Sequence, residues 1–330
     1  MNKIRLEIVK LLHQNPDSFV SGQELSDKLG VSRTTISNYI KDLRHKGYKI
    51  KSKTNKGYKL LKSPDMIIPE EILWKLSTEK IGKNIKFYNE IDSTNEKAKE
   101  IAGKVPGGTV ILTEKQKKGK GRRGREWYSP AGSGLWFSII LYPDFQPDKA
   151  PMLTVLAALS VEESLDDMNI ATDIKWPNDI ILNNKKIAGI LSELNAEIDQ
   201  INYAVVGIGI NVNQDSFPQN LKDIASSLKI ETGKNIDRVN LLNNIFYSFE
   251  RYYKMLLSDK EEELLKIWKN KLKCLNKRVV IDSNGKIYRG KAVDVSLKGE
   301  LVIKDEKGKE HSFWTGDTSL KEWCEEGEKI

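Results

Sequence analysis

Residues 119–127 read Gly119-Lys120-Gly121-Arg122-Arg123-Gly124-Arg125-Glu126-Trp127, with three glycines and four cations in nine positions. This composition suits a loop that closes backbone amides and guanidinium groups around a phosphate. The loop matches G-x-G-x-x-G, but a dinucleotide fingerprint needs a helix after it, and here the apolar run 135–142 predicts a strand. The sequence has no G-x-x-x-x-G-K-[ST] motif either. A dinucleotide-binding fold and a P-loop are therefore excluded. By itself, the segment could also be a solvated basic loop or a nucleic-acid patch.

Charge and cysteine content narrow the class of protein. The 330 residues are enough for two or three domains. Residues 1–62 hold 14 Lys/Arg against 5 Asp/Glu, a net charge of +9, while the rest of the chain has −1. The signal for polyanion binding therefore belongs to the N-terminal segment. Two cysteines and three scattered histidines argue against a disulfide framework, a thiolate zinc site and a Ser-His-Asp triad. No apolar run approaches the ~20 residues of a membrane span, so we expect a cytoplasmic protein without a membrane partner.

The first 62 residues predict a winged helix-turn-helix domain. A first short helix ends at Asn15-Pro16, a capping box at residues 21–24 begins a second that stops at Gly30, and a third buries Ile36, Ile40 and Leu43. A basic hairpin over residues 48–61 is the predicted wing, with Lys53 and Lys56 on phosphates. The alternative is a three-helix interaction module. The polar face that the third helix would present to a major groove comprises Arg33, Thr34, Thr35, Ser37, Asn38 and Lys41.

The remainder predicts an α+β architecture. Between residues 63 and 274, strands near 86–90, 108–113, 135–142, 172–175, 186–194 and 203–212 are interspersed with helices at 95–103, 151–168 and 239–268, which favours one mixed sheet. Residues 275–330 alternate turns with short strands at 278–281, 287–295, 301–304 and 311–314, typical of a small β-barrel.

Four blocks surround the glycine-rich loop in a distinctive order: Ser93-Thr94-Asn95 before it and, after it, Lys175-Trp176-Pro177-Asn178-Asp179, residues 185–191 and Gly207-Ile208-Gly209-Ile210-Asn211-Val212-Asn213. In this order they resemble the bifunctional biotin protein ligase and biotin operon repressor family, over nearly the whole chain. The resemblance implies an AMP-forming ligase that converts biotin and ATP to biotinyl-5′-AMP and transfers biotin to a lysine of a biotin carboxyl carrier protein. It further implies a homodimeric repressor on an inverted-repeat operator, with the adenylate as corepressor, and a C-terminal SH3-like barrel.

Joining a carboxylate to an amine in water needs activation, and the site must neutralise phosphate charge without a nucleophile of its own. Arg122 is the predicted guanidinium that grips the reacting phosphate and the biotin carboxylate. Lys186 is the second positive group; the alternative is a lysine at a strand edge, against which the family motif argues. Asp179 is the predicted carboxylate that orients Mg²⁺ or accepts a proton from the incoming amine, two roles that the residues alone do not separate.

The same resemblance assigns binding residues. Asn95 is expected to cap the following helix. Lys120 stands where the family carries arginine, which puts a bidentate contact in doubt there. Lys321 occupies the place of a family arginine that is associated with the nucleotide. The predicted biotin site comprises Ser93, Thr94, Asn95, Gln116, Gly119, Lys120, Gly121, Arg122, Lys186 and Gly189. The predicted ATP site comprises Arg122, Trp127, Asn178, Lys186, Asn211 and Lys321.

Two other functions remain open. One is a transcription factor whose central domain only senses a small ligand, against which Arg122, Lys186 and the block 175–179 argue. The other is a lipoate-ligase-like acyltransferase, against which the glycine-rich loop and the N-terminal winged helix argue.

Overall fold

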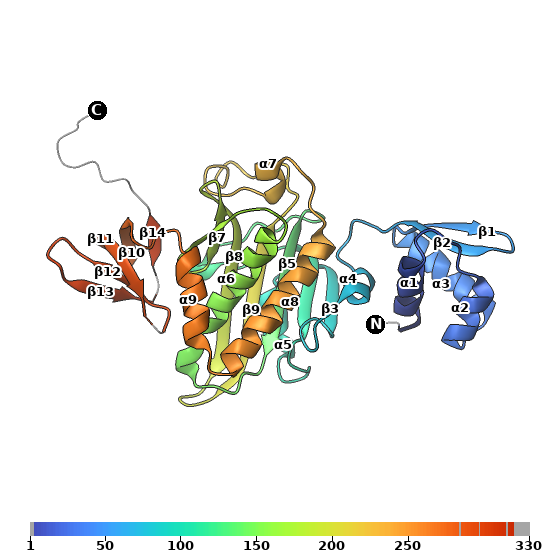
Figure 1. Cartoon of the computed structure of the whole chain (residues 1–330), viewed down its shortest axis with the longest axis horizontal. Helices are drawn as coiled ribbons and strands as arrows, with labels where there is room; N and C mark the ends of the chain where they lie inside the picture. Colours follow the sequence, from blue (N-terminus) through green and yellow to red (C-terminus); the bar gives the residue numbers. More distant parts are fainter. Residues whose placement is uncertain (1–2, 284, 297, 315, 320–330) are drawn as a thin grey trace. The chain divides into compact units, whose positions relative to one another are not determined.

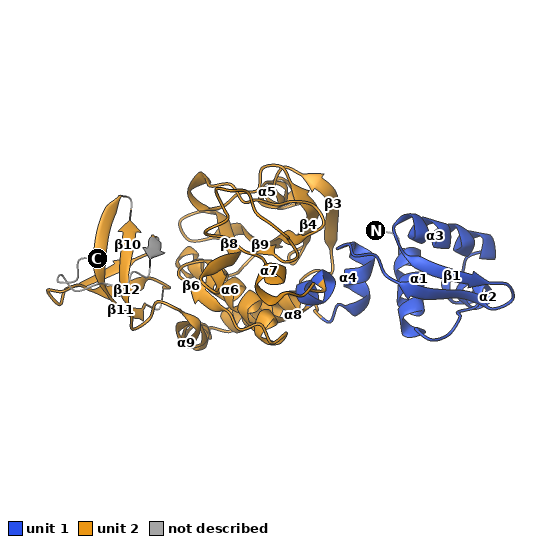
Figure 2. Ribbon diagram, turned by 90° about the horizontal axis from the view of Figure 1, so that it is seen from above, with its two compact units in different colours: residues 1–77, 238–243 blue, residues 78–237, 244–330 orange. Residues whose placement is uncertain are grey.

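The structure is a computed structural model of the chain, and it describes residues 3–283, 285–296, 298–314 and 316–319. It divides into two compact units, shown in different colours in Figure 2. The first comprises residues 1–77 with residues 238–243, and the second comprises residues 78–237 with residues 244–330.

The first unit has the predicted winged helix-turn-helix arrangement. Its elements are α1 (Lys3–Gln14), α2 (Gly22–Leu29), α3 (Arg33–His45), β1 (Lys49–Lys53), β2 (Gly57–Lys62) and α4 (Pro69–Lys75). The Ser21 hydroxyl accepts hydrogen bonds from the amides of the first turn of α2, and Gly30 ends that helix with φ 63°. The wing joins the start of α2, because Val20 and Tyr58 exchange backbone hydrogen bonds of 2.8 and 2.9 Å.

Helix α4 was not predicted, and it contains two glutamates, Glu70 and Glu71. Both side chains are buried, at 1% and 5% exposure. Arg5 pairs with Glu70, and His13 Nε2 lies 3.1 Å from Glu71 Oε1. Burial alone would raise the pKa of Glu71, but its polar contacts, first of all the hydrogen bond with His13, outweigh burial and lower that pKa below its usual value. The acidic residues of α4 are therefore core residues of this unit.

The second unit contains a seven-stranded mixed sheet, as predicted. Strand order is β3-β4-β5-β9-β8-β7-β6, in which β3 and β4 are parallel and the other neighbours antiparallel. The strands are β3 (Ile85–Ile91), β4 (Val110–Gln116), β5 (Gly134–Leu141), β6 (Asp173–Lys175), β7 (Asp179–Leu182), β8 (Lys185–Ala196) and β9 (Ile201–Asn211). The helices are α5 (Thr94–Ile101), α6 (Pro151–Asp166), α7 (Leu228–Thr232), α8 (Arg238–Leu257) and α9 (Glu261–Lys271), with short 3₁₀ turns at Arg122–Gly124 and Pro147–Lys149.

Helices cover the sheet on both faces. Ala98 of α5 packs on Ile111, Ile140 and Val205 from three adjacent strands. On the other face, the rings of Phe137 and Phe246 meet edge to face at 5.6 Å, and α6 lies between α9 and α8 (Figure 1). Because side chains alternate between the faces of a strand, Gly207 shares the α5 face with Val205.

Two predictions of secondary structure were wrong. The helix expected over residues 239–268 is two helices, because Asp259 adopts φ 54° and the Lys260 amide turns back to the Met255 carbonyl. Three glutamates then begin α9, where the helix dipole favours negative charge. No strand was predicted between Asp179 and Lys185, but this segment contains β7 and an Asn183-Asn184 turn with positive φ at both residues.

Where the sequence predicts a small β-barrel, the strands between residues 278 and 319 form an antiparallel five-stranded sheet of order β13-β12-β11-β10-β14. Its strands are β10 (Arg278–Ser283), β11 (Lys286–Val295), β12 (Leu301–Lys304), β13 (Glu310–Phe313) and β14 (Asp317–Ser319). Within the described ranges, no helix combines the length and apolar character that crossing a bilayer requires.

Candidate active site

A cleft of about 1790 Å³ opens in the second unit on the α5 side of the sheet. The glycine-rich loop, strands β7 to β9 and the segment 217–225 contribute its walls. Lys321 lies outside the described residues. The other predicted ligase residues all line the cleft: Ser93, Thr94, Asn95, Gln116, Gly119, Lys120, Gly121, Arg122, Trp127, Asn178, Asp179, Lys186, Gly189 and Asn211.

The glycine-rich loop is a narrow hairpin. The Trp127 amide donates to the Gly119 carbonyl at 2.8 Å, and the Gly121 amide donates to the Arg125 carbonyl at 2.7 Å. A Cβ atom on Gly119 would lie 2.4 Å from the Trp127 carbonyl oxygen, so this position requires glycine. The hairpin thereby places the side chain of Arg122 in the cleft.

Asn178 holds the guanidinium group of Arg122. Its Oδ1 accepts a hydrogen bond of 2.8 Å from Arg122 Nη1, and its Nδ2 donates to the Ile190 carbonyl at 2.8 Å. Asn178 is buried, and both ends of its amide are used. The side chain therefore orients the cation, a role that sequence reasoning did not assign to it.

Lys186 and Asp179 face each other across the β7–β8 hairpin. Their Nζ and Oδ1 atoms are 2.6 Å apart, and the side chains are 33% and 20% exposed. The same Nζ lies 5.1 Å from the centre of the Trp127 ring. The carboxylate and the indole thus fix an ammonium group at the cleft wall, where burial strengthens its field.

Two paired glycines form a recess for Trp127. Gly189 and Gly209 are direct partners on β8 and β9. Cβ atoms there would lie 2.9 and 2.4 Å from the indole ring. The Gly207-Ile208-Gly209 pattern of β9 also serves to clear this face of the sheet, because two alternate glycines in a strand leave one of its faces without side chains.

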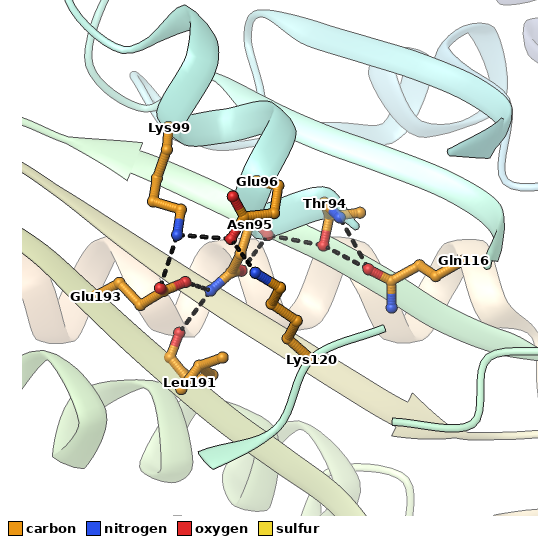
Figure 3. Close-up of polar contacts among 9 residues, drawn as sticks. Thr94, Asn95, Glu96, Lys99, Gln116, Lys120, Leu191 and Glu193 are labelled. Carbon is orange, nitrogen blue, oxygen red and sulfur yellow. Dashed lines mark hydrogen bonds and ion pairs between the residues drawn. The ribbon is translucent and has the colours of Figure 1, made fainter. Parts of the chain in front are cut away.

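The end of the cleft near α5 holds an interlocked set of polar side chains (Figure 3). Gln116 Oε1 accepts from the Thr94 amide at 2.8 Å, and Gln116 Nε2 donates to Ser129 Oγ at 2.9 Å. Ser138 Oγ donates to Asn95 Oδ1 at 2.6 Å and lies 2.8 Å from the Thr94 hydroxyl oxygen. These contacts fix the orientation of hydroxyl and amide groups at one end of the cleft.

The expectation that Asn95 caps the following helix was wrong. Helix α5 begins at Thr94 with Ser93 as its N-cap residue, which makes no side-chain capping bond. Asn95 instead donates to the Leu191 carbonyl at 3.2 Å and to Glu193 Oε2 at 2.7 Å. A Cβ atom on Gly207 would lie 2.0 Å from Asn95 Oδ1. Asn95 therefore packs against the sheet, where Gly207 leaves space for its side chain and Glu193, 98 residues away, accepts its hydrogen bond.

Both ends of the Asn211 side-chain amide form hydrogen bonds within the protein. Its Nδ2 donates to the Ser226 carbonyl at 3.0 Å, and its Oδ1 accepts from Gln214 at 3.2 Å. The Lys186 amide donates to the Ile224 carbonyl at 2.9 Å, and the Ser226 amide donates back to Lys186 at 3.0 Å. Asn211 and the start of β8 therefore hold the segment 217–226 at the cleft.

The comparisons with known proteins agree on one family. A sequence model of the "Biotin/lipoate A/B protein ligase family" matches residues 87–211, and one of an "HTH domain" matches residues 4–59. The chain is 38% identical over 309 residues to "Bifunctional ligase/repressor BirA" of Bacillus spizizenii, covering 92% of this chain and 95% of that protein. It belongs to the bifunctional ligase/repressor family. The protein of the same name in Escherichia coli is 27% identical over 321 residues, covering 97% of this chain and 98% of that one.

A solved structure agrees with this family. "Biotin protein ligase from Aquifex aeolicus in complex with biotin and ATP" is 34% identical, has a TM-score of 0.65, and covers 72% of this chain and 99% of its own.

The residues that match the HTH domain model, 4–59, lie in the first unit. Ile36, Ile40 and Leu43 of α3 are buried, which turns the opposite face of that helix outward. The predicted contact residues Arg33, Thr34, Asn38 and Lys41 are exposed, and Thr35 and Ser37 are half-buried. Lys53 and Lys56 are exposed in the hairpin. This face is polar and basic, as major-groove recognition requires.

Three charged residues beside the cleft escaped the sequence reasoning: Glu96, Lys99 and Glu193 (Figure 3). Glu193 follows Leu191 by two positions, so it shares the α5 face of β8. Glu193 is the single acidic residue of β8, and this was the available signal for that residue.

Proposed function

We propose that this protein activates biotin with ATP, transfers it to a lysine of a biotin carboxyl carrier protein, and represses transcription from operator DNA. The main observation in favour of ligase activity is that two cations, Arg122 and Lys186, line the same cleft, one end of which presents amide groups. Family membership and the biotin and ATP bound to the Aquifex aeolicus relative support the choice of substrates.

In the first reaction, a biotin carboxylate oxygen attacks the α-phosphorus of ATP. The new C(O)–O–P bond gives biotinyl-5′-AMP, and the bond to the β-phosphate oxygen breaks to release pyrophosphate. Negative charge gathers on the phosphate oxygens as this happens. Arg122, oriented by Asn178, and Lys186, oriented by Asp179, provide fixed positive groups for that charge.

Biotin binds with its polar ring toward the α5 end of the cleft. Ser93, Thr94 and Gln116 present hydroxyl and amide groups there. The glycine face of β8, with Leu191, leaves room for the apolar tail. Small ligands bind in such apolar clefts with a few fixed polar contacts. This orientation directs the carboxylate toward Arg122.

ATP occupies the opposite part of the cleft. The segment 217–225, with Phe217 near Tyr128 at a ring distance of 6.2 Å, supplies an apolar wall for adenine. Asn211 maintains that wall rather than contacting the nucleotide, since its amide groups are already bonded. Trp127 contributes its indole at the boundary between the biotin and nucleotide parts, beneath Lys186. We keep Lys321 as a nucleotide contact on the family resemblance alone.

The residues fit a Mg²⁺ ion held mainly by phosphate oxygens. Among the described residues, no group of three His, Cys, Asp or Glu side chains gathers, and Mg²⁺ in nucleotide sites usually has only one or two protein carboxylates. Asp179 would supply that carboxylate. When bound, the ion would neutralise phosphate charge.

In the second reaction, a lysine amine attacks the acyl carbon of the adenylate, the C–O bond to AMP breaks, and an amide forms. The amine must lose a proton. Asp179 lines the cleft and is the proposed acceptor of that proton when it does not orient the metal ion.

The repressor half rests on the first unit. We place the DNA-binding domain at residues 1–62, the catalytic domain at 63–274 and the small β domain at 275–330. One winged helix reads only a short half-site, so we propose a homodimer on an inverted repeat, with biotinyl-5′-AMP as corepressor. ATP, carrier protein and DNA occur together in the cytoplasm, where we place the protein.

Pyrophosphate release tests the ligase half. The purified protein should release pyrophosphate with ATP and biotin and should not do so with ATP and lipoate. Activity with lipoate alone would favour the lipoate-ligase-like acyltransferase, since the family model that matches this chain covers both biotin and lipoate ligases. Biotin binding without pyrophosphate release would leave only the ligand-sensing transcription factor.

A further inference from the structure

A chain of alternating charges connects the glycine-rich loop to the sheet (Figure 3). Lys120 Nζ lies 2.6 Å from Glu96 Oε1, and Lys99 Nζ lies 2.6 Å from the same oxygen. Lys99 also reaches Glu193 Oε1 at 2.8 Å, and Glu193 Oε2 accepts from Asn95 at 2.7 Å. The loop, α5 and β8 are thereby joined through side chains alone.

Glu96 occupies the central position in this chain. Its position three residues before Lys99 puts both on one face of α5, and Glu193 holds Lys99 from the sheet side. Hydrogen bonds from Lys120 and then from Lys99 lower the pKa of Glu96 below its usual value. The carboxylate is therefore ionised at neutral pH and held toward the loop.

Two of the side-chain contacts near the tip of the loop differ in kind. Arg122 is bonded to Asn178, and a ligand phosphate or carboxylate would compete for the same guanidinium. Lys120 is bonded instead to Glu96 of α5, a residue that does not line the cleft. The second attachment can persist while Arg122 changes partners.

We propose that Glu96 is a positioning residue which, braced by Lys99 and Glu193, holds Lys120 and keeps the glycine-rich loop over the cleft while the acyl adenylate is retained. The retention of the adenylate rests on the proposed function. The attachment of the loop rests on the contacts alone, and the two parts are tested separately.

Limited proteolysis tests the loop without any ligand. Trypsin cuts after Arg123 and Arg125, which are exposed near the loop tip. Both Lys120 and Glu96 are close to half-exposed, so losing this pair should raise the rate of loop cleavage about two- to five-fold. Glu96→Gln and Lys120→Met should each have this effect, and their combination should add nothing further. Glu96→Lys combined with Lys120→Glu should restore slow cleavage.

Glu100→Gln is the matched control. It removes another ion pair of the same spacing on the same helix, Lys97–Glu100 at 2.7 Å, which does not reach the loop. Cleavage of Glu100→Gln should proceed at the rate of the unmodified protein. Equal rates for Glu96→Gln and the unmodified protein, or independent effects of Glu96→Gln and Lys120→Met, would overturn the proposal.

Adenylate retention tests the functional consequence. Labelled biotin and ATP are incubated with each protein, excess unlabelled biotin is added, and the loss of bound label is followed at low and high salt. Glu96→Gln should release label about two- to five-fold faster at low salt, with the difference shrinking as salt screens the pair. An unchanged release rate would overturn the retention role. Absence of pyrophosphate from the unmodified protein would instead overturn the proposed function, and the cleavage result would still decide the loop attachment.

Discussion

Replacing Lys186 with methionine tests whether its ammonium group stabilises the transition state or whether its side chain only contributes packing. The substitution keeps the apolar stem of the side chain and removes the ammonium group that lies 2.6 Å from Asp179. Because the pair is partly exposed, its loss should cost only about 0–1 kcal/mol of folding stability. Loss of a fixed positive group at a developing phosphate charge should cost far more, about 10²- to 10³-fold in kcat for adenylation.

The assay measures pyrophosphate release at saturating biotin and ATP, with biotin affinity determined separately by calorimetry. Affinity should change much less than kcat, because the charge matters most as the phosphate charge develops. Lys229→Met is the matched control. Lys229 is 31% exposed and forms a pair of 2.7 Å with Asp215, and neither residue lines the cleft. It should leave kcat unchanged.

A double variant distinguishes a missing cation from an unpaired carboxylate. If the loss came only from leaving Asp179 without its partner, Lys186→Met with Asp179→Asn would recover activity. We expect no recovery. Recovery in the double variant, or equal losses in biotin affinity and kcat, would refute the assignment of Lys186 to the transition state.

Three further outcomes are expected. Arg122→Gly should still consume ATP but label bystander amines, because the cation that holds the adenylate is gone; adenylate dissociating no faster than from the unmodified protein would contradict this. Arg33→Ala should relax base specificity, whereas Lys53→Ala should weaken binding to all sequences and lower the salt slope by about one, as operator titrations at several salt concentrations would show. Since the folded-state pKa of Glu71 is lowered from 4.5, its contribution to stability is present above about pH 4.5 and is lost as pH falls through the folded-state value. Glu71→Gln should therefore lower the melting temperature at neutral pH and reduce its acid dependence; an acid limb as steep as in the unmodified protein would exclude that contribution.

The N-terminal domain could be predicted from local patterns. The spacing of Ile36, Ile40 and Leu43 defines the buried stripe of α3, and the capping box at Ser21 sets the start of α2. Such signals depend on residues within a few positions of one another. Helix α4 was missed because its burial depends on Arg5 and His13, more than 50 residues earlier. A pair of glutamates has no local signature of being buried.

The cleft shows the same division. The sequence by itself determined which residue types could neutralise a phosphate, and the order of the four blocks identified their family. Only the tertiary structure decided how they are used: Asn178 holds Arg122 across 56 residues, and Asn95 binds Glu193 across 98 instead of capping its helix. Composition and spacing along the chain report local conformational preference. Hydrogen-bond partners depend on which strands become neighbours, and that is set by the packing of the whole sheet.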